Sequence, residues 1–192
     1  MDKKILVLAS SNLGKIKEFQ KLFPNHQIMS ARSMGFTGII VEDGETFYDN
    51  ALIKAQTVYE ALKMPVIADD SGLCVSCLNG APGVHSARYS DEETDEANNK
   101  KLLEEMENSN YRNAKYVCCL VYISEDGAIH SSIGECTGKI LRAAVGSNGF
   151  GYDPLFLSDD LGKSFGEVLQ AEKDTCSHRA RAVEILKKNT DL

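Results

Sequence analysis

The pattern of hydrophobic and polar positions predicts alternating strands and helices in the first half of the chain. Short runs of consecutive hydrophobic residues are typical of buried strands, and longer stretches bounded by capping residues are typical of helices. Thr46 is expected to be the N-cap of one helix, with Asp49 completing a capping box. The predicted elements are strands over residues 5–9, 27–31, 66–68 and 73–78 and helices over residues 16–23 and 46–62.

The second half has a different pattern, in which strands pair with one another. Ser90 followed by three acidic residues is typical of a helix cap, and it predicts a helix to about Glu107. The turn at residues 125–127 is typical of a hairpin. The other predicted elements are strands over residues 115–124, 128–137 and 154–157, a glycine-rich loop over residues 146–153 and a helix over residues 177–188. Together the two halves predict a single α/β domain over residues 1–192 with a mixed sheet.

Composition limits the classes of partner. Of the 192 residues, 43% are hydrophobic and 26% charged, which is typical of a globular chain. The net charge of −7 disfavours non-specific binding to nucleic acid or membranes, so an anionic substrate would need a local basic pocket, with metal ions. No hydrophobic run approaches the roughly 20 residues of a membrane span. Polar residues interrupt the first hydrophobic run too early for a signal peptide, so we expect a cytoplasmic protein.

Cysteine spacing offers a weaker signal. Cys74 and Cys77 form a CxxC motif, but this motif falls on a predicted strand. Residues three apart on a strand point to opposite faces, so a shared metal is disfavoured and packing is the favoured role.

The adjacent carboxylates Asp69 and Asp70 are the sharpest chemical signal. They follow the hydrophobic run at residues 65–67, at the expected end of a buried strand. Burying two carboxylates is costly unless a cation or a proton offsets them, so the pair points to a divalent metal such as Mg²⁺. One carboxylate could hold the metal while the other activates water, and spacing does not say which. The alternative is a turn with capping aspartates.

Phosphate groups have two candidate sites near the start of predicted helices. The turn Ser10-Ser11-Asn12-Leu13-Gly14-Lys15 offers backbone N–H groups, hydroxyls and a lysine, although it lacks the glycine spacing of a Walker A loop. Lys54 lies on one face of the second predicted helix with Asn50, and Glu42 precedes that helix at a position that could reach a metal. Ordinary turns and a solvated helix face remain alternatives.

A flat ligand such as a base could bind two further segments. The stretch Gly149 to Asp153 allows close approach of backbone and aromatic rings, and Phe150 could stack on a base. Ser177 is a good N-cap, and the following His178 and Arg179 could donate hydrogen bonds to carbonyl oxygens. A packed aromatic turn and an ordinary capped helix are the alternatives.

These motifs also occur in one known order. The segments SSNLGKIKEF, EDGETFYDNALIKA, ADDSGLCV, GAPGVHSARYS, GFGYDPLF and SHRARA resemble the inosine triphosphate pyrophosphatase family, which contains the dITP/XTP pyrophosphatases. The resemblance covers residues 5 to about 186. It implies an elongated mixed β-sheet flanked by helices, with two lobes and a central cleft. It also implies Mg²⁺-dependent hydrolysis of ITP, dITP and XTP to the monophosphate and pyrophosphate, which cleanses the nucleotide pool, by a homodimer.

The resemblance further implies roles for individual residues. Glu42 and Asp70 are expected to hold Mg²⁺, with Asp70 as the proton acceptor and Asp69 as its support. The residues expected to bind the phosphates or contact the substrate are Ser10, Ser11, Asn12, Leu13, Gly14, Lys15, Lys54 and Ser71. Those expected to frame the base and sugar are Phe150, Gly151, Tyr152, Asp153, Lys173, His178 and Arg179.

Three alternatives compete with this reading. One is a phosphate-binding structural module, and the net charge of −7 disfavours a nucleic-acid version of it. A Maf-like pyrophosphatase would prefer modified pyrimidine or methylated nucleotides, so the best triphosphate substrate distinguishes it. A non-catalytic nucleotide sensor would bind ITP without turnover and would have no use for a water-activating Asp70. The presence of both aspartates together with Glu42 and three lysines favours an enzyme.

Overall fold

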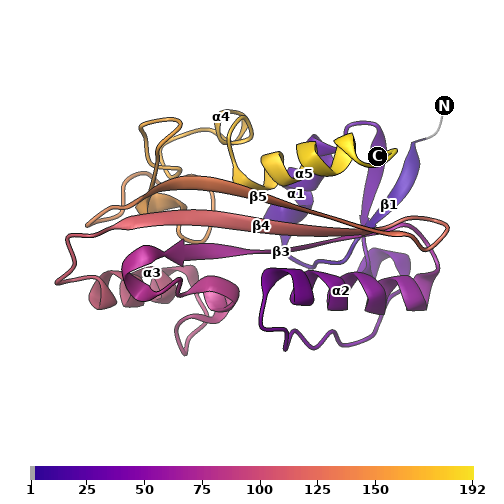
Figure 1. The fold of residues 1–192 in the computed structure, drawn as a ribbon, viewed down its shortest axis with the longest axis horizontal. Coiled ribbons are helices and arrows are strands. Elements are labelled where there is room, and N and C mark those ends of the chain that lie inside the picture. Colours follow the sequence, from indigo (N-terminus) through magenta and orange to yellow (C-terminus); the bar gives the residue numbers. More distant parts are fainter. Residues whose placement is uncertain (1–2) are drawn as a thin grey trace. The chain divides into compact units, whose positions relative to one another are not determined.

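The computed structural model of the protein describes residues 3–192, which contain a six-stranded mixed sheet flanked by helices (Figure 1). The strand order is β2-β1-β3-β4-β5-β6. Strand β1 pairs in parallel with β2 and β3, whereas β5 and β6 are antiparallel. The strands are β1 (Lys4–Leu8), β2 (His26–Ser30), β3 (Val66–Val75), β4 (Asn113–Ile123), β5 (Ile129–Ile140) and β6 (Phe156–Ser158). The predicted α/β fold with a mixed sheet is confirmed.

The helices lie between and after these strands. The α-helices are α1 (Leu13–Leu22), α2 (Phe47–Leu62), α3 (Asp95–Glu105), α4 (Gln170–Lys173) and α5 (His178–Lys188). Short 3-10 helices are η1 (Arg32–Met34), η2 (Ser76–Leu78), η3 (Gly83–Arg88) and η4 (Asp153–Leu155). Within residues 3–192, no helix is both long and apolar enough to cross a membrane.

The chain divides into two compact units. Unit 1 consists of the chain up to Asp70 together with Cys118–Ile133 and Ala182–Leu192. Unit 2 consists of Ser71–Val117 and Gly134–Arg181. Because each unit draws on several chain segments, strands β3, β4 and β5 each contribute residues to both.

Unit 1 has a hydrophobic core on each face of its part of the sheet. Helices α1 and α5 cover one face and α2 covers the other (Figure 1). The buried side chains of the first core are Leu6, Leu8, Phe19, Phe23, Ile28, Ile67, Cys118, Leu120, Ala182, Val183 and Leu186. Those of the second core are Val7, Ala9, Ala31, Phe36, Ala51, Ala55, Val58, Val66, Ala68, Val121 and Ile123. A sheet covered on both faces explains the continuous hydrophobic runs of β1 and β3.

The predicted start of α2 is confirmed. The Thr46 hydroxyl accepts a hydrogen bond from the Asp49 backbone N–H at 3.1 Å, and the Asp49 carboxylate accepts one from the Thr46 backbone N–H at 3.2 Å. This reciprocal capping box satisfies two backbone donors that the helix itself leaves without partners. The local sequence therefore determines where α2 begins.

The predicted start of α1 is wrong by three residues. The Asn12 side-chain oxygen accepts hydrogen bonds from the backbone N–H groups of Gly14 at 2.8 Å and Lys15 at 3.1 Å, so Asn12 is the N-cap. Leu13, Gly14 and Lys15 therefore belong to the first helical turn rather than to a loop. An asparagine cap outweighs the low helix propensity of glycine at this position.

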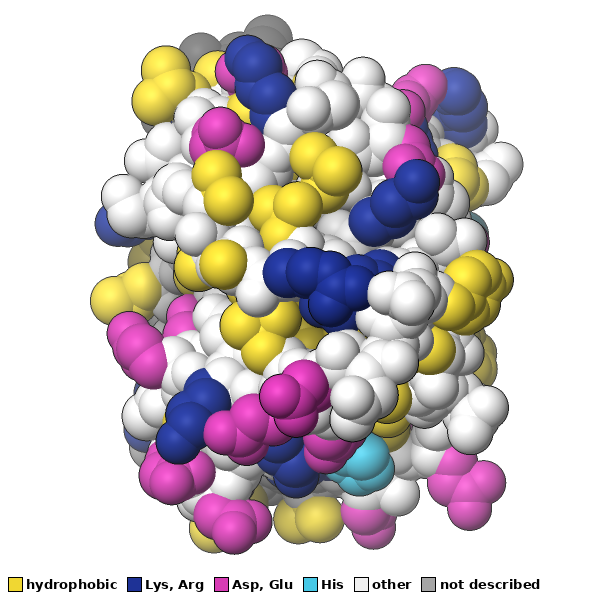
Figure 2. Space-filling model, turned by 90° about the vertical axis from the view of Figure 1, so that its left-hand side faces the viewer, with side chains coloured by type: hydrophobic (Ala, Val, Ile, Leu, Met, Phe, Trp, Pro, Cys, Tyr) yellow, Lys and Arg dark blue, Asp and Glu magenta, His cyan; other side chains and the backbone are white. Residues whose placement is uncertain are grey.

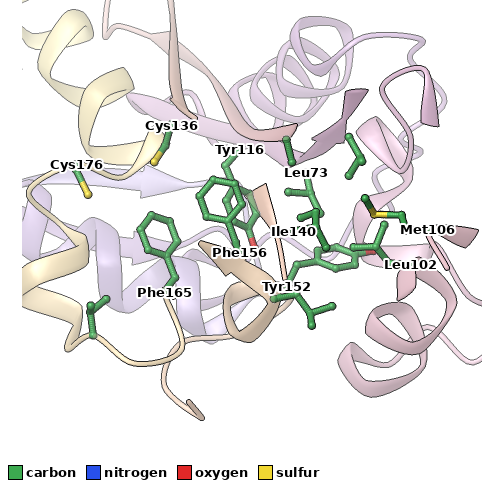
Figure 3. Close-up of a cluster of buried hydrophobic side chains, with 14 residues drawn as sticks. Leu73, Leu102, Met106, Tyr116, Cys136, Ile140, Tyr152, Phe156, Phe165 and Cys176 are labelled. Carbon is green, nitrogen blue, oxygen red and sulfur yellow. The ribbon is translucent and has the colours of Figure 1, made fainter. Parts of the chain in front are cut away.

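Unit 2 encloses an aromatic core. Tyr116 packs against Phe156 with ring centroids 4.7 Å apart, and Phe156 packs against Phe165 at 5.1 Å. Figure 3 shows these rings together with Leu73 and Tyr152 in one buried cluster. Strands β3, β4 and β5 supply alternate residues to it, as expected for a sheet with one buried face.

Three predicted boundaries are wrong: those of β3, of α3 and of the strand at residues 154–157. Strand β3 runs without interruption through the two aspartates, and residues 76–78 form η2 instead of strand. Helix α3 begins after Thr94, whose hydroxyl accepts the Ala97 backbone N–H at 3.2 Å, whereas Ser90 is held by Asn98. The predicted strand at residues 154–157 is η4 followed by β6. The α3 boundary is set by a local cap, because the Thr94 hydroxyl and the Ala97 N–H are only three residues apart.

Candidate functional site

Asp69 and Asp70 lie within β3 and not in a turn. Neighbouring side chains on a strand point to opposite faces, so these two carboxylates meet different partners. Asp69 is 1% exposed and Asp70 8% exposed. Both carboxylates are therefore buried, and each needs a cation to offset the cost of desolvation.

Lys15 provides the cation for Asp69. Its ammonium group forms an ion pair with Asp69 Oδ1 and lies 3.4 Å from the Asp69 carbonyl oxygen. On the same side, the Cys118 thiol donates to Asp69 Oδ2 at 3.1 Å. The first turn of α1 is thereby attached to β3 through a charged group.

Lys54 provides the cation for Asp70. Its Nζ atom lies 2.8 Å from Asp70 Oδ1, and the Asn50 side-chain amide donates to Asp70 Oδ2 at 3.4 Å. Burial raises the pKa of Asp70 above the usual value, and the Lys54 ammonium offsets this only in part. A carboxylate with a raised pKa accepts a proton more readily than an ordinary one, which suits a general base.

Glu42 shares the same lysine. Lys54 Nζ lies 2.6 Å from Glu42 Oε2, so one ammonium group contacts both Glu42 and Asp70. Burial lowers the pKa of Lys54, but the Asp70 and Glu42 carboxylates outweigh this effect and raise it overall, so the lysine stays charged. We call Lys15, Glu42, Lys54, Asp69 and Asp70 the lysine–carboxylate cluster.

A close backbone approach holds Glu42 near helix α2. The Asn50 side-chain oxygen accepts the Gly44 backbone N–H at 2.9 Å. A Cβ atom at Gly44 would lie 2.7 Å from Asp49 Cβ and 2.8 Å from the Asn50 oxygen, so glycine is required there. Asn50 thus ties the loop that carries Glu42 to the strand that carries Asp70.

The donor set of Glu42 and Asp70 fits a hard divalent cation. Their oxygens approach one positive charge from two elements, and Mg²⁺ typically takes one or two carboxylates and completes its shell with water and phosphate oxygens. Within residues 3–192 there is no group of three or more His, Cys, Asp or Glu side chains that could hold a metal by itself. A metal at this pair would therefore depend on oxygens that the protein does not supply.

The turn before α1 presents polar groups to solvent. Ser10 accepts the Asn12 backbone N–H at 3.2 Å, and Ser11 and Asn12 are exposed. Leu13 is 72% exposed, which leaves its backbone rather than a packed side chain as its possible contribution to a site. The Asn12 cap occupies the Gly14 and Lys15 N–H groups, so the exposed polar side chains and the nearby Lys15 are the groups that could bind an anion here.

Unit 2 contains a second group of candidate residues, arranged around Asp153. The buried Asp153 carboxylate accepts from Lys173 Nζ at 2.7 Å, from the Phe150 backbone N–H at 3.0 Å and from the Tyr116 hydroxyl at 3.3 Å. A Cβ atom at Gly149 would lie 2.0 Å from Asp153 Oδ2, and the φ of +77° also requires glycine there. The loop is therefore shaped around this carboxylate.

Aromatic contacts complete this second group. Lys173 Nζ lies 5.0 Å from the centre of the Phe150 ring, and the His178 ring stacks on Tyr116 with centroids 4.8 Å apart. Burial and the nearby Asp153 carboxylate raise the pKa of Tyr116 well above the usual value, so its hydroxyl remains a neutral donor. We call Tyr116, Phe150, Asp153, Lys173 and His178 the aromatic–lysine cluster.

Arg179 contacts another predicted site residue of unit 2, Ser71. It is 1% exposed, and its Nη2 donates to the Ser71 hydroxyl at 3.0 Å. The predicted residues Gly151 and Tyr152 contact α3 and η3: the Gly151 backbone N–H donates to Asp95, and the Tyr152 hydroxyl donates to the Ser86 carbonyl at 2.8 Å.

Sequence reasoning missed Cys118, Tyr116 and Asp95. Each contacts a predicted site residue that is 37 to 56 positions away in the chain. Tyr116 and Cys118 are two apart on β4, a spacing that signals one shared face, but the pattern does not identify what that face meets.

Taken together, the fold and the two clusters define an α/β protein with buried carboxylates matched to lysines and an aromatic, ion-paired loop. The model of the Ham1 family matches residues 6–189, and the chain belongs to this family. A dITP/XTP pyrophosphatase of Treponema denticola is 43% identical over 182 residues, which are 93% of this chain and 94% of that protein.

Solved structures agree with the fold. The Staphylococcus aureus Ham1 protein superimposes with a TM-score of 0.88 at 38% identity and covers 97% of each chain. The Mycobacterium abscessus nucleoside-triphosphatase / dITP/XTP pyrophosphatase gives a TM-score of 0.77 at 35% identity, covering 95% of this chain and 98% of that one. The family resemblance inferred from the motifs is confirmed.

Proposed function

We propose that this protein hydrolyses the non-standard purine nucleoside triphosphates ITP, dITP and XTP to the monophosphate and pyrophosphate. Its Ham1 family membership and the dITP/XTP pyrophosphatases among its relatives support this activity. The observation that carries the proposal is the Lys54 ammonium held between Glu42 and Asp70, because it brings together a phosphate-binding charge, a metal-binding pair and a proton acceptor. The same proposal treats residues 1–192 as one functional domain.

The lysine–carboxylate cluster would bind the triphosphate. Lys15, Lys54 and the polar turn before α1 would bind phosphate oxygens, and Glu42 and Asp70 would hold Mg²⁺. When bound, the metal would neutralise charge on the phosphate oxygens. Asp70 would take the proton from the water that attacks the α-phosphorus, and the two lysines would stabilise the departing pyrophosphate.

The aromatic–lysine cluster would bind the nucleoside. The Phe150 ring would stack on the base, and Lys173 would hold that ring through its contact at 5.0 Å. His178 and Arg179 would donate hydrogen bonds to the O6 oxygen of the purine. Adenine carries an amino group at that position, so the same donors would lose their acceptor and ATP would be rejected.

Replacing Arg179 with alanine is expected to lower the preference of the enzyme for ITP over ATP. A lost hydrogen bond between buried groups costs about 1–3 kcal/mol, so kcat/KM for ITP should fall roughly tenfold or more, with a smaller fall for ATP. The measurement is the ratio of kcat/KM values for the two substrates.

Arg181→Ala is the matched control, since Arg181 is on the same helix but pairs with Asp160 at 2.8 Å. It should leave the ratio unchanged. An Arg179→Ala enzyme that rejects ATP as strongly as the wild type would remove the proposed role.

The remaining partners follow from charge and family. We expect a homodimer in the cytoplasm that binds neither nucleic acid nor membranes. The net charge of −7 disfavours nucleic acid and membranes, and the dimer and the location rest on the family resemblance alone. On the face drawn in Figure 2, a group of Lys and Arg side chains lies in the middle and acidic side chains lie mostly below it.

Pyrophosphate release tests the proposed function. Purified protein with Mg²⁺ is supplied in turn with ITP, XTP, dITP, ATP and GTP, and with ITP in excess EDTA. The proposal predicts a large preference for the first three and loss of activity with EDTA. Comparable rates on ATP and GTP would contradict the substrate class, and binding of ITP without turnover would identify a sensor instead.

A further inference from the structure

Helix α3 holds the Gly149–Asp153 loop through the backbone N–H and carbonyl groups of Gly151. The Asp95 carboxylate accepts the Gly151 backbone N–H at 2.7 Å, and the Asn99 side-chain amide donates to the Gly151 carbonyl at 3.0 Å. Asp95 and Asn99 are four residues apart, so they lie one above the other on the same face of α3. We call these two hydrogen bonds the Gly151 clamp.

The clamp lies between two residues proposed to frame the base. Phe150 precedes Gly151, and Asp153 follows two positions later with its ion pair to Lys173. The orientation of the Gly151 peptide groups limits where the Phe150 ring can lie, because the two residues share a peptide bond. Asp153 fixes one end of this short loop and the clamp fixes its middle.

A second segment, residues 86–90, is attached to the same helix. The Asn98 amide donates to the Ala87 carbonyl at 3.2 Å, and its oxygen accepts the Ser90 backbone N–H at 2.7 Å. The Tyr152 hydroxyl then joins the two loops through the Ser86 carbonyl. The first turns of α3 therefore organise both segments, within unit 2 alone.

The Asn99 side-chain oxygen contributes nothing to fold stability, in contrast to the amide nitrogen that holds the Gly151 carbonyl. This oxygen is buried and has no hydrogen-bond partner within the described residues. A buried acceptor without a partner lowers stability, so an apolar residue would suit the fold better at that atom. Asp95, in contrast, has an ordinary reason to be present, because an acidic residue in a first helical turn interacts favourably with the helix dipole. The test must separate that effect from the clamp.

We propose that Asp95 and Asn99 are positioning residues that set purine selectivity by holding the Gly151 peptide groups, and with them the Phe150 ring. This inference rests on the proposed function of the Gly149–Asp153 loop in binding the base. It assigns neither residue a direct contact with the reacting atoms.

The test uses Asp95→Ala and Asn99→Asp. The first removes the acceptor of the Gly151 N–H, and the second replaces the donor of the clamp by an oxygen of nearly the same shape. Each should raise KM for ITP about tenfold, change kcat less than about threefold and lower the ITP to ATP ratio of kcat/KM, because each loses one hydrogen bond of the clamp, which is charge-assisted at Asp95.

Two variants serve as controls. Asp95→Asn keeps an oxygen acceptor and should retain KM within about threefold of the wild type. Glu96→Ala removes the other acidic residue of the same helical turn and leaves the clamp intact, so it reports the dipole effect alone. Thermal unfolding of each variant identifies any general loss of structure.

Hydrogen exchange of the peptide covering residues 148–153 provides a readout that does not depend on activity. Faster exchange in Asp95→Ala and Asn99→Asp, together with the KM and selectivity changes, supports the inference. Unchanged exchange overturns the clamp. Faster exchange with unchanged KM and selectivity overturns the role in recognition. If the wild type hydrolyses no triphosphate, the proposed function is wrong, and so is the proposed role of the clamp in selectivity. Hydrogen exchange still decides in that case whether the clamp exists.

Discussion

Replacing Asp70 with asparagine is expected to lower kcat for pyrophosphate release from ITP by about 100- to 10,000-fold, the usual contribution of a general base. Asparagine has nearly the same shape and keeps a polar contact with Lys54, but it cannot accept a proton from water. Burial also raises the pKa of Asp70, which makes it a better acceptor than an exposed carboxylate. The measurement is kcat at saturating ITP and Mg²⁺, so that weaker metal binding does not explain the loss.

Asp43→Asn is the matched control, because Asp43 is exposed and next to Glu42 in sequence. It should leave kcat unchanged. Asp69→Asn should have a smaller effect than Asp70→Asn, since Asp69 is occupied by Lys15 and Cys118. An Asp70→Asn enzyme within tenfold of the wild type would contradict the assignment of the base.

Replacing Lys173 with methionine should lower the free energy of unfolding by about 3–5 kcal/mol, because it leaves a buried carboxylate without its cation. The side chains of Lys173 and Asp153 are only 3% and 2% exposed, and Lys173 Nζ lies 2.7 Å from Asp153 Oδ2. Methionine fills a similar volume, so the lost charge and not a cavity would cause the change. Urea denaturation measures this difference.

Two comparisons make this prediction specific. Lys163→Met breaks the ion pair between Lys163 and Glu172, whose side chains are 56% and 43% exposed. It should lower the free energy of unfolding by less than about 1 kcal/mol. The double variant Lys173→Met/Asp153→Asn should recover part of the lost stability, since neither position of the pair then carries a buried charge. A loss below about 1 kcal/mol in the single variant would show that Asp153 does not depend on Lys173.

Local signals predicted the parts of the fold that local interactions determine. The capping box of Thr46 and Asp49 lies within four residues, and the predicted start of α2 is correct. The hairpin turn at residues 125–127 is also correct, because its hydrogen bonds join residues 124 and 128. These elements need no information from distant parts of the chain.

Distant contacts explain the error at the two aspartates, and competing local caps explain the error at α3. The segment Asp69-Asp70-Ser71-Gly72 has the composition of a turn, yet it continues β3 because Lys15 and Lys54 neutralise its carboxylates. Thr94 rather than Ser90 caps α3, and Ser90 instead bonds with Asn98. No local pattern around the two aspartates contains Lys15 or Lys54, whereas the Thr94 cap is a local contact that competes with Ser90 in the sequence.

The candidate site follows the same division. The motifs identified Lys15, Glu42, Lys54, Asp69 and Asp70, which the structure brings together in unit 1, and Phe150, Asp153, Lys173 and His178, which it brings together in unit 2. Their catalytic and binding roles stay predictions. What sequence could not supply is the separation of the two aspartates onto opposite faces of β3, since that depends on whether the strand continues through them.

The central claim is that this protein breaks the bond between the α- and β-phosphorus atoms of a non-standard purine triphosphate by attack of water on the α-phosphorus. Hydrolysis of ITP in ¹⁸O-labelled water, followed by mass spectrometry of the products, tests it most directly. The account predicts one ¹⁸O atom in the inosine monophosphate and none in the pyrophosphate. Label in the pyrophosphate, or orthophosphate and a diphosphate as the first products, would contradict it.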